Sequence, residues 1–118
     1  MKLGEIAEQL ALEIQTAEQQ LASEVTGGYA SDLLSCVMAK AQAGNIWITL
    51  QGHPNIVAVA SLLNLAGVVI TEGMMPETAT LQKAEEEAIP ILTTPLTAYT
   101  VAGKLFSLGV PGVDRESE

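Results

Sequence analysis

The sequence contains little from which a catalytic, metal-binding or nucleic-acid-binding site could be built. It has one cysteine, one histidine and only five lysine and arginine residues among its 118 residues. A single cysteine excludes an intramolecular disulfide, and no ligand pairs stand at the spacing of a zinc or iron site. The five cations are scattered, whereas nucleic acids and anionic membranes bind clustered basic patches. We therefore expect no metal or other cofactor, no nucleic-acid partner and no membrane partner.

Aromatic residues and long apolar runs are also scarce. Aromatic residues make up 3% of the chain although hydrophobic residues make up 48%, so the core must consist of Ala, Val, Ile and Leu. The apolar segment 56–70 is shorter than the roughly 20 residues of a membrane span, and Ser61, Asn64 and Gly67 interrupt it. Residues 1–5 become acidic before a signal-peptide core develops. Together with the lone cysteine, these features predict a cytoplasmic protein.

Acidic residues dominate the charge, and the formal net charge is −9. Many of them stand in residues 85–87 and 114–118, a pattern typical of a solvated helix face and a frayed terminus rather than a cation site. A chain of this length forms one domain, which we assign to residues 1–110, followed by a polar C-terminal tail over residues 111–118. The apolar fraction is high for so small a domain, which predicts a homodimer.

The apolar periodicity predicts a layered α/β domain with a mostly parallel sheet and alternating βα units. Strands are expected over residues 12–15, 46–50, 67–71 and 90–93. Helices are expected over about 3–10, 33–43, 56–64, 77–88 and 98–108, with Ser31 or Asp32 capping the second helix and Gly44 closing it. The regular alternation of one strand and one helix is typical of a parallel sheet with right-handed crossovers. Trp47 should point away from the face that Ile46 and Ile48 share.

The predicted helix that begins at residue 56 is apolar on nearly every side. Such a helix must be covered on both faces, either by the sheet and another helix or by the sheet and a partner subunit. It is therefore the first candidate for the homodimer interface.

Three loops are candidates for a ligand site, because ligands of open α/β sheets bind outside the carboxyl ends of the strands. The loops cover residues 51–55, 71–76 and 93–97, and they offer polar side chains: His53, Asn55, Glu72 and several threonines, among them Thr94. His53 could serve as an acid, a base or a ligand near neutral pH. Its position between Gly52 and Pro54 at a helix start favours the role of a hydrogen-bonding turn residue.

Thr26-Gly27-Gly28 is a second candidate, because a glycine-rich turn before a helix can hold phosphate with backbone amides. A P-loop also requires a lysine followed by Ser or Thr, and here no lysine occurs before Lys40. Asp32 in the first turn of the helix would repel a phosphate. A tight turn is therefore the favoured interpretation of the glycine pair.

Residues 24–35 and 53–60 resemble the DRTGG domain, and the resemblance extends over about residues 12–108. Thr26, Gly27 and Gly28 match the last three letters of the motif, whereas Glu24 and Val25 replace its Asp and Arg. This family is similar to the amino-terminal domain of HPr kinase/phosphorylase. Its members stand beside phosphotransacetylase, cobyrinic-acid-synthase-like or CBS domains, or occur alone.

The resemblance implies a non-catalytic regulatory module that binds a small ligand, such as a nucleotide-like compound, or a protein partner. The residues expected to bind the ligand are Thr26, Gly27, Gly28, His53, Asn55 and Thr94. One alternative is a structural subunit that docks its apolar helix on a larger complex. Another is an HPr-kinase-like phosphotransfer enzyme, which would require the P-loop and clustered acids that the sequence lacks.

Overall fold

A five-stranded sheet in the order β1-β5-β4-β3-β2 forms the middle layer of the computed structural model, which describes residues 1–114. Four strands are parallel and follow one another in chain order: β2 (Gly27–Ala30), β3 (Asn45–Thr49), β4 (Gly67–Ile70) and β5 (Ile91–Thr93). The fifth strand, β1 (Glu13–Ile14), pairs antiparallel with β5 at one edge. The predicted mostly parallel sheet with alternating helices is confirmed.

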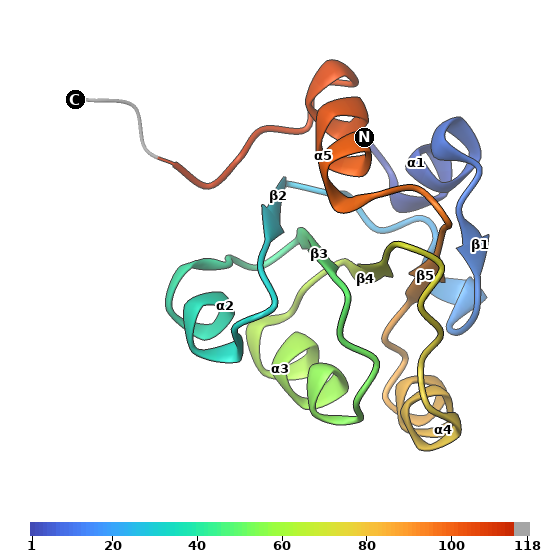
Figure 1. Cartoon of the computed structure of the whole chain (residues 1–118). Helices are drawn as coiled ribbons and strands as arrows, with labels where there is room; N and C mark the ends of the chain where they lie inside the picture. The colour runs from blue at the N-terminus through green and yellow to red at the C-terminus, as the bar shows by residue number, and fades with distance from the viewer. Residues whose placement is uncertain (115–118) are drawn as a thin grey trace.

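Helices cover both faces of this sheet (Figure 1). The crossover helices α2 (Leu34–Lys40), α3 (Asn55–Leu63) and α4 (Thr78–Glu86) lie on one face, and α1 (Leu3–Leu10) and α5 (Ala98–Ser107) lie on the other. A short 3₁₀ turn, η1 (Glu18–Gln20), precedes β2. Each crossover leads to the adjacent strand in the same direction, so crossovers of one hand place all three helices on the same face. No helix of residues 1–114 is long and apolar enough to cross a membrane.

Strand side chains divide between two cores, one on each face of the sheet. Trp47 belongs to the core beneath α2, α3 and α4, whereas Ile46 and Ile48 belong to the core beneath α1 and α5. The same alternation holds in β4, where Val68 and Val69 lie on opposite faces. The predicted orientation of Trp47 is confirmed.

The glycine pair does not form the predicted tight turn. Gly27 and Gly28 are the first residues of β2 and pair with Asn45 and Ile46 of β3. A Cβ atom on Gly27 would lie 3.0 Å from the Pro111 carbonyl oxygen and 3.2 Å from the Asn45 amide nitrogen. This position therefore favours glycine because the backbone of a distant segment approaches closely, and that segment cannot be identified from local sequence.

The segment after α5 lies beside β2, where the Gly28 amide donates a 2.8 Å hydrogen bond to the Pro111 carbonyl oxygen. Gly112 forms a parallel bridge with Gly28 at the same place. The beginning of the predicted tail thus contacts the edge strand, while residues 115–118 of that tail lie outside the described part of the chain.

The predicted cap of the second helix is wrong. α2 begins at Leu34, and no side chain of its N-cap residue, Leu33, bonds to the helix amides. The Ser31 hydroxyl accepts a 3.1 Å hydrogen bond from the Leu33 amide, which lies before the helix. The Asp32 carboxylate instead accepts hydrogen bonds from Thr49 and Leu50. Gly44 does not close the helix either, because α2 ends at Lys40 and Gly44 adopts a φ of +83° in the turn before β3.

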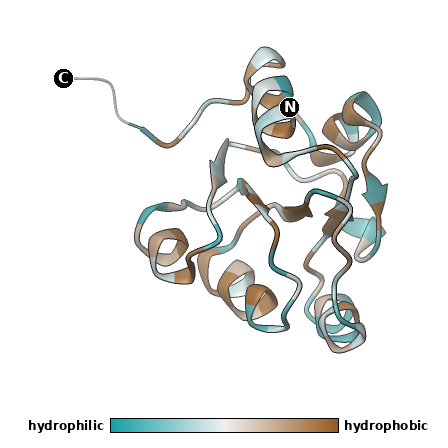
Figure 2. Cartoon of the chain, in the orientation of Figure 1, coloured by the Kyte–Doolittle hydropathy of each residue, from teal (hydrophilic) through white to brown (hydrophobic). Residues whose placement is uncertain are grey.

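The apolar helix α3 is covered mainly by its own chain. It packs on the sheet and contacts α2 and α4 on its flanks, and its ribbon is brown over much of its length (Figure 2). Four of its side chains are buried: Ile56, Val57, Val59 and Ala60. Leu62 is its exposed large side chain. Most of the apolar surface of α3, the first candidate for the dimer interface, is therefore buried within the subunit.

Candidate functional site at the carboxyl edge of the sheet

An open hollow of about 420 Å³ lies beyond the carboxyl end of β3. Its lining comes from three separate connections: Asp32 before α2, residues 50–53 after β3, and Glu77 at the start of α4. Both carboxylates and the imidazole of His53 are exposed to solvent there. This placement agrees with the general position of ligand sites in open α/β sheets.

Asp32 organises one side of this hollow. Its Oδ1 atom accepts a hydrogen bond from the Thr49 hydroxyl at 2.7 Å and another from the Leu50 amide at 2.8 Å. The side chain of Gln51 donates to the Asp32 carbonyl oxygen at 2.7 Å, and the Gln51 amide donates to the Thr49 hydroxyl at 3.1 Å. The segments after β2 and β3 therefore hold each other in place without any ligand.

His53 lies at the start of α3 and bonds to its backbone. Its Nδ1 atom accepts a 3.0 Å hydrogen bond from the Asn55 amide, and its carbonyl oxygen accepts one from Ile56 at 3.1 Å. The neutral imidazole then carries its proton on Nε2, where it can donate to a ligand. The first amides of α3 are already bound, so this helix start is not an open anion site.

Gly52 brings the loop before α4 against the hollow. A Cβ atom on Gly52 would lie 2.9 Å from the Met75 carbonyl oxygen and 3.1 Å from the Cα atom of Pro76. The Gly52 carbonyl oxygen accepts hydrogen bonds from the Glu77 amide at 3.0 Å and the Thr80 hydroxyl at 2.6 Å. A glycine is required at this position because the backbone of the neighbouring loop lies in direct contact with it.

A second hollow, of about 270 Å³, lies at the same edge of the sheet and contains Thr94 in its lining. Residues 73–75 and 93–95 form most of its wall. The Thr94 hydroxyl accepts a hydrogen bond from the Leu96 amide at 3.1 Å, and the residue is only 4% exposed. Glu72, another sequence candidate, caps α5 by accepting a 3.0 Å hydrogen bond from the Ala98 amide.

The structure separates the predicted site residues into two groups. His53, Asn55 and Thr94 follow the carboxyl ends of β3 and β5, whereas Thr26, Gly27 and Gly28 stand at the amino end of β2. The five residues of β3 span about 17 Å between these two edges. The glycine motif and His53 therefore do not line one hollow.

Sequence reasoning missed Asp32 and Glu77 as neighbours of His53, and it included Gln51 in the candidate loop 51–55 without naming it as a site residue. Asp32 looked like a helix cap, and only the pairing of β2 with β3 brings it to the hollow. Within residues 1–114, no three His, Cys, Asp or Glu side chains form a group that could hold a metal ion.

A family model of the DRTGG domain matches residues 5–108. The chain belongs to the DRTGG domain family. No functionally curated protein matches its sequence. A solved structure of the CBS and DRTGG domains of the regulatory region of Clostridium perfringens pyrophosphatase, complexed with the activator diadenosine tetraphosphate, is similar with a TM-score of 0.71 and 20% identity. The match covers 99% of this chain and 51% of that structure, so this chain spans about half its length. At this identity the likeness shows a shared fold.

The Thr-Gly-Gly part of the DRTGG motif joins β2 to the turn before β3. The Thr26 hydroxyl donates to the Ala43 carbonyl oxygen at 2.9 Å and accepts from the Asn45 side chain at 3.2 Å. The Thr26 amide donates to the Gly44 carbonyl oxygen at 2.9 Å. In this DRTGG domain the threonine of the motif therefore forms hydrogen bonds with residues 43–45, and these bonds stabilise one edge of the sheet.

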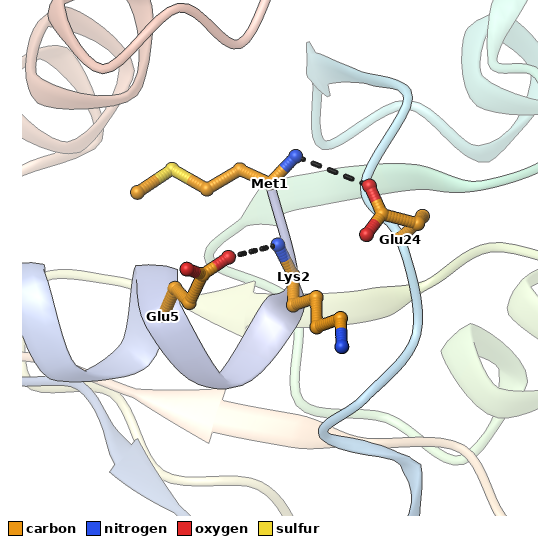
Figure 3. Close-up of polar contacts among 4 residues, drawn as sticks. All are labelled: Met1, Lys2, Glu5 and Glu24. Atoms are coloured by element: carbon orange, nitrogen blue, oxygen red, sulfur yellow. Dashed lines mark hydrogen bonds and ion pairs between the residues drawn. The ribbon is translucent and has the colours of Figure 1, made fainter.

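Glu24 and Val25, where this DRTGG domain departs from the motif, contact the amino-terminal segment. Glu24 Oε1 lies 3.2 Å from the Met1 amino nitrogen, beside the hydrogen bond from the Lys2 amide to Glu5 (Figure 3). Val25 is 7% exposed and belongs to the core beneath α1 and α5. An arginine at position 25 would have to place its charge in this core, which is costly without a partner.

Proposed function

We propose that this DRTGG domain is a non-catalytic regulatory module that binds a small ligand in the hollow around His53. The observation that carries the proposal is the convergence of Asp32, Gln51, His53 and Glu77 at the carboxyl edge of the sheet. The fold shared with a DRTGG domain from the regulatory region of a pyrophosphatase supports a regulatory role. The P-loop and nucleophile motifs of phosphotransfer enzymes and hydrolases are missing from the sequence, which supports the absence of catalysis.

The chemistry of the hollow favours the nucleoside part of a nucleotide-like ligand. Asp32 and Glu77 offer carboxylate oxygens that accept hydrogen bonds from ribose hydroxyls or an amino group, and His53 Nε2 offers a donor. Gln51 can extend the polar wall with its side-chain carbonyl oxygen, because its amino group already donates to Asp32. Among residues 1–114, no lysine or arginine lines the hollow, so phosphate groups would gain no ion pair from these residues.

Thr94 and Asn55 have supporting positions in this proposal. Thr94 lines the second hollow at the same edge, into which a long ligand could extend, and Asn55 supplies the amide that orients the imidazole of His53. We assign Thr26, Gly27 and Gly28 to the stability of β2 rather than to ligand contacts, because they lie at the other end of the sheet. We also propose that the protein acts as a homodimer in the cytoplasm.

Thermal melting with added ligands tests this proposal. Adenosine, adenine nucleotides, diadenosine tetraphosphate and acyl phosphates form a suitable set of probes. A ligand at about 100 times its Kd adds roughly 2.7 kcal/mol to the free energy of unfolding, which should raise the Tm by on the order of ten degrees in a domain of this size.

His53→Asn is the informative variant for this experiment. Asparagine can still accept a hydrogen bond from the amide two residues ahead, so the start of α3 should persist while the imidazole Nε2 is lost. Gln82→Ala, on the exposed face of α4, is the matched control. We expect His53→Asn to abolish most of the ligand-induced shift and Gln82→Ala to retain it. A shift that survives His53→Asn, or no shift with any probe, would contradict the proposed site.

A further inference from the structure

α5 carries the two most exposed aromatic side chains of the described residues. Tyr99 is 89% exposed and Phe106 is 73% exposed. The whole sequence has only one Trp, two Tyr and one Phe, so half of its aromatic residues stand unburied on one helix. Aromatic side chains bury large areas and are enriched at protein interfaces. This helix is therefore the strongest candidate for a contact with another chain.

Gly103 lies between these two side chains on α5. Positions 99, 103 and 106 are spaced four and three residues apart, so they share one face of the helix. A Cβ atom on Gly103 would meet nothing within 4 Å, and the residue is exposed. Glycine lowers the stability of a helix relative to alanine, and packing within the subunit gives no reason for it. A glycine here leaves space for the backbone of a second helix.

Hollows lie on both sides of this face. The first, of about 140 Å³, is mainly apolar and is lined by Phe106 together with Tyr29 of β2 and Val110. The second, of about 570 Å³, lies between α1 and α5 and contains Tyr99 and Lys104 in its lining. A third aromatic residue is thus adjacent to the exposed face, which can receive protruding side chains from a partner.

We propose that α5 forms the homodimer interface, with the α5 helices of two copies crossing antiparallel at Gly103. This inference rests on the homodimer of the proposed function and assigns its contact surface. Tyr99 precedes Gly103 by four residues and Phe106 follows it by three, so a two-fold axis at the crossing places Tyr99 of each copy against Phe106 of the partner subunit. A pattern that is complementary to its own inverted copy is what an isologous interface requires.

The charge of the protein supports a second copy as the occupant. Two chains of net charge −9 repel each other, and they approach most easily through a surface without carboxylates. α5 contains no acidic residue, and its single charged residue, Lys104, is a cation at the side of the face. α3 also lacks acidic residues. It exposes one large apolar side chain, Leu62, whereas α5 exposes two aromatic side chains.

The exposed apolar area on α5 can be compared with the area that a stable protein interface buries. Aromatic side chains bury about 150–250 Å² each, so the exposed parts of Tyr99 and Phe106 contribute about 300 Å² per copy. Four rings then supply about 600 Å², half of the roughly 1,200 Å² at the lower limit of a standard interface. The walls of the flanking hollows add to this area but do not supply the other half by themselves, so the proposed contact also needs the other exposed residues of α5 and its neighbours.

Light scattering after size-exclusion chromatography at tens of micromolar tests the interface. We expect twice the chain mass for the wild type, and the monomer mass for Tyr99→Glu and Phe106→Glu, because each places an unpaired carboxylate in the contact. Leu62→Glu is the matched control, since it puts the same charge on a comparably exposed apolar residue of α3. We expect this control to remain a dimer.

Gly103→Leu distinguishes a loss of dimerisation from a loss of folding. Leucine favours the helix, and its Cβ atom would meet no other atom within 4 Å, so the Tm of the monomer should not fall, whereas the dimer should dissociate at least tenfold more readily. Dimers that persist in Phe106→Glu and Gly103→Leu would overturn the α5 interface, and dissociation of Leu62→Glu alone would move it to α3. A wild type that is monomeric at 100 µM would overturn the homodimer as well. The ligand-induced Tm shift tests the ligand site separately in every case.

Discussion

Asp32 accepts a 2.7 Å hydrogen bond from the hydroxyl of Thr49, which ties the segment after β2 to the end of β3. The same oxygen accepts from the Leu50 amide. Asp32→Ala should lower the free energy of unfolding by about 1–2 kcal/mol, because the buried Thr49 hydroxyl and the amide lose their acceptor. Asp32→Asn keeps the oxygen and should cost less. Urea titration of both variants measures the difference, and equal losses would contradict this role for Asp32.

Gly44 should tolerate alanine much less well than Gly109. Both glycines have a positive φ, +83° and +96°, so alanine is strained by about 1–2 kcal/mol at either position. At Gly44 the new Cβ would also lie 2.7 Å from Thr26 Cγ2, whereas at Gly109 it would meet nothing within 4 Å. Chemical denaturation should therefore show a larger loss for Gly44→Ala. Equal losses would mean that the Thr26 side chain can move away freely.

Thr71 and Thr80 should respond in opposite directions to replacement by valine. Both side chains are fully buried. Among the described residues, the Thr71 hydroxyl has no hydrogen-bond partner, whereas the Thr80 hydroxyl donates to Gly52 at 2.6 Å. Thr71→Val should raise the free energy of unfolding by about 1 kcal/mol, and Thr80→Val should lower it by about 1–2 kcal/mol. Differential scanning calorimetry decides the sign, and destabilisation by Thr71→Val would show that its hydroxyl has a partner.

The two glycines of the motif should differ in their tolerance of alanine. Gly27→Ala should destabilise the domain by about 1 kcal/mol or more, because its Cβ would press on Pro111 and Asn45. Gly28→Ala should be nearly neutral, since its Cβ would meet its neighbours no closer than 3.6 Å. Neither variant should change the ligand-induced Tm shift at the His53 hollow. If Gly28→Ala folds stably but loses the ligand-induced Tm shift, the glycine motif contributes to ligand binding and our assignment is wrong.

Additional phosphate groups should weaken binding to the His53 hollow at low salt. In the part of the chain that the structure describes, Asp32 and Glu77 line this hollow and no lysine or arginine does, so each phosphate adds repulsion. Calorimetric titration with adenosine and ATP at about 20 and 300 mM salt should show weaker binding of ATP, and the difference should narrow as salt screens the charges. Tighter binding of ATP at low salt would contradict a nucleoside-directed hollow.

The sequence by itself determined most of the local elements, although not β2, and the faces of the sheet that residues 46–48 occupy. The continuous apolar run 46–48 indicates a strand that is buried on both faces, and the structure places Trp47 opposite Ile46 and Ile48 as predicted. The parallel sheet followed from the spacing of strands and helices, because a parallel pair requires a crossover between its strands.

Only the tertiary structure decided which distant segments meet. Gly27 and Gly28 read locally as a turn, yet they form an edge strand because β3 pairs on one side and residues 111–112 approach on the other. The same pairing moves Asp32 from an apparent helix cap to the His53 hollow and leaves the glycine motif at the opposite end of the sheet. Local periodicity records whether a side chain is buried, but strand order and close backbone approach depend on contacts between residues far apart in the chain.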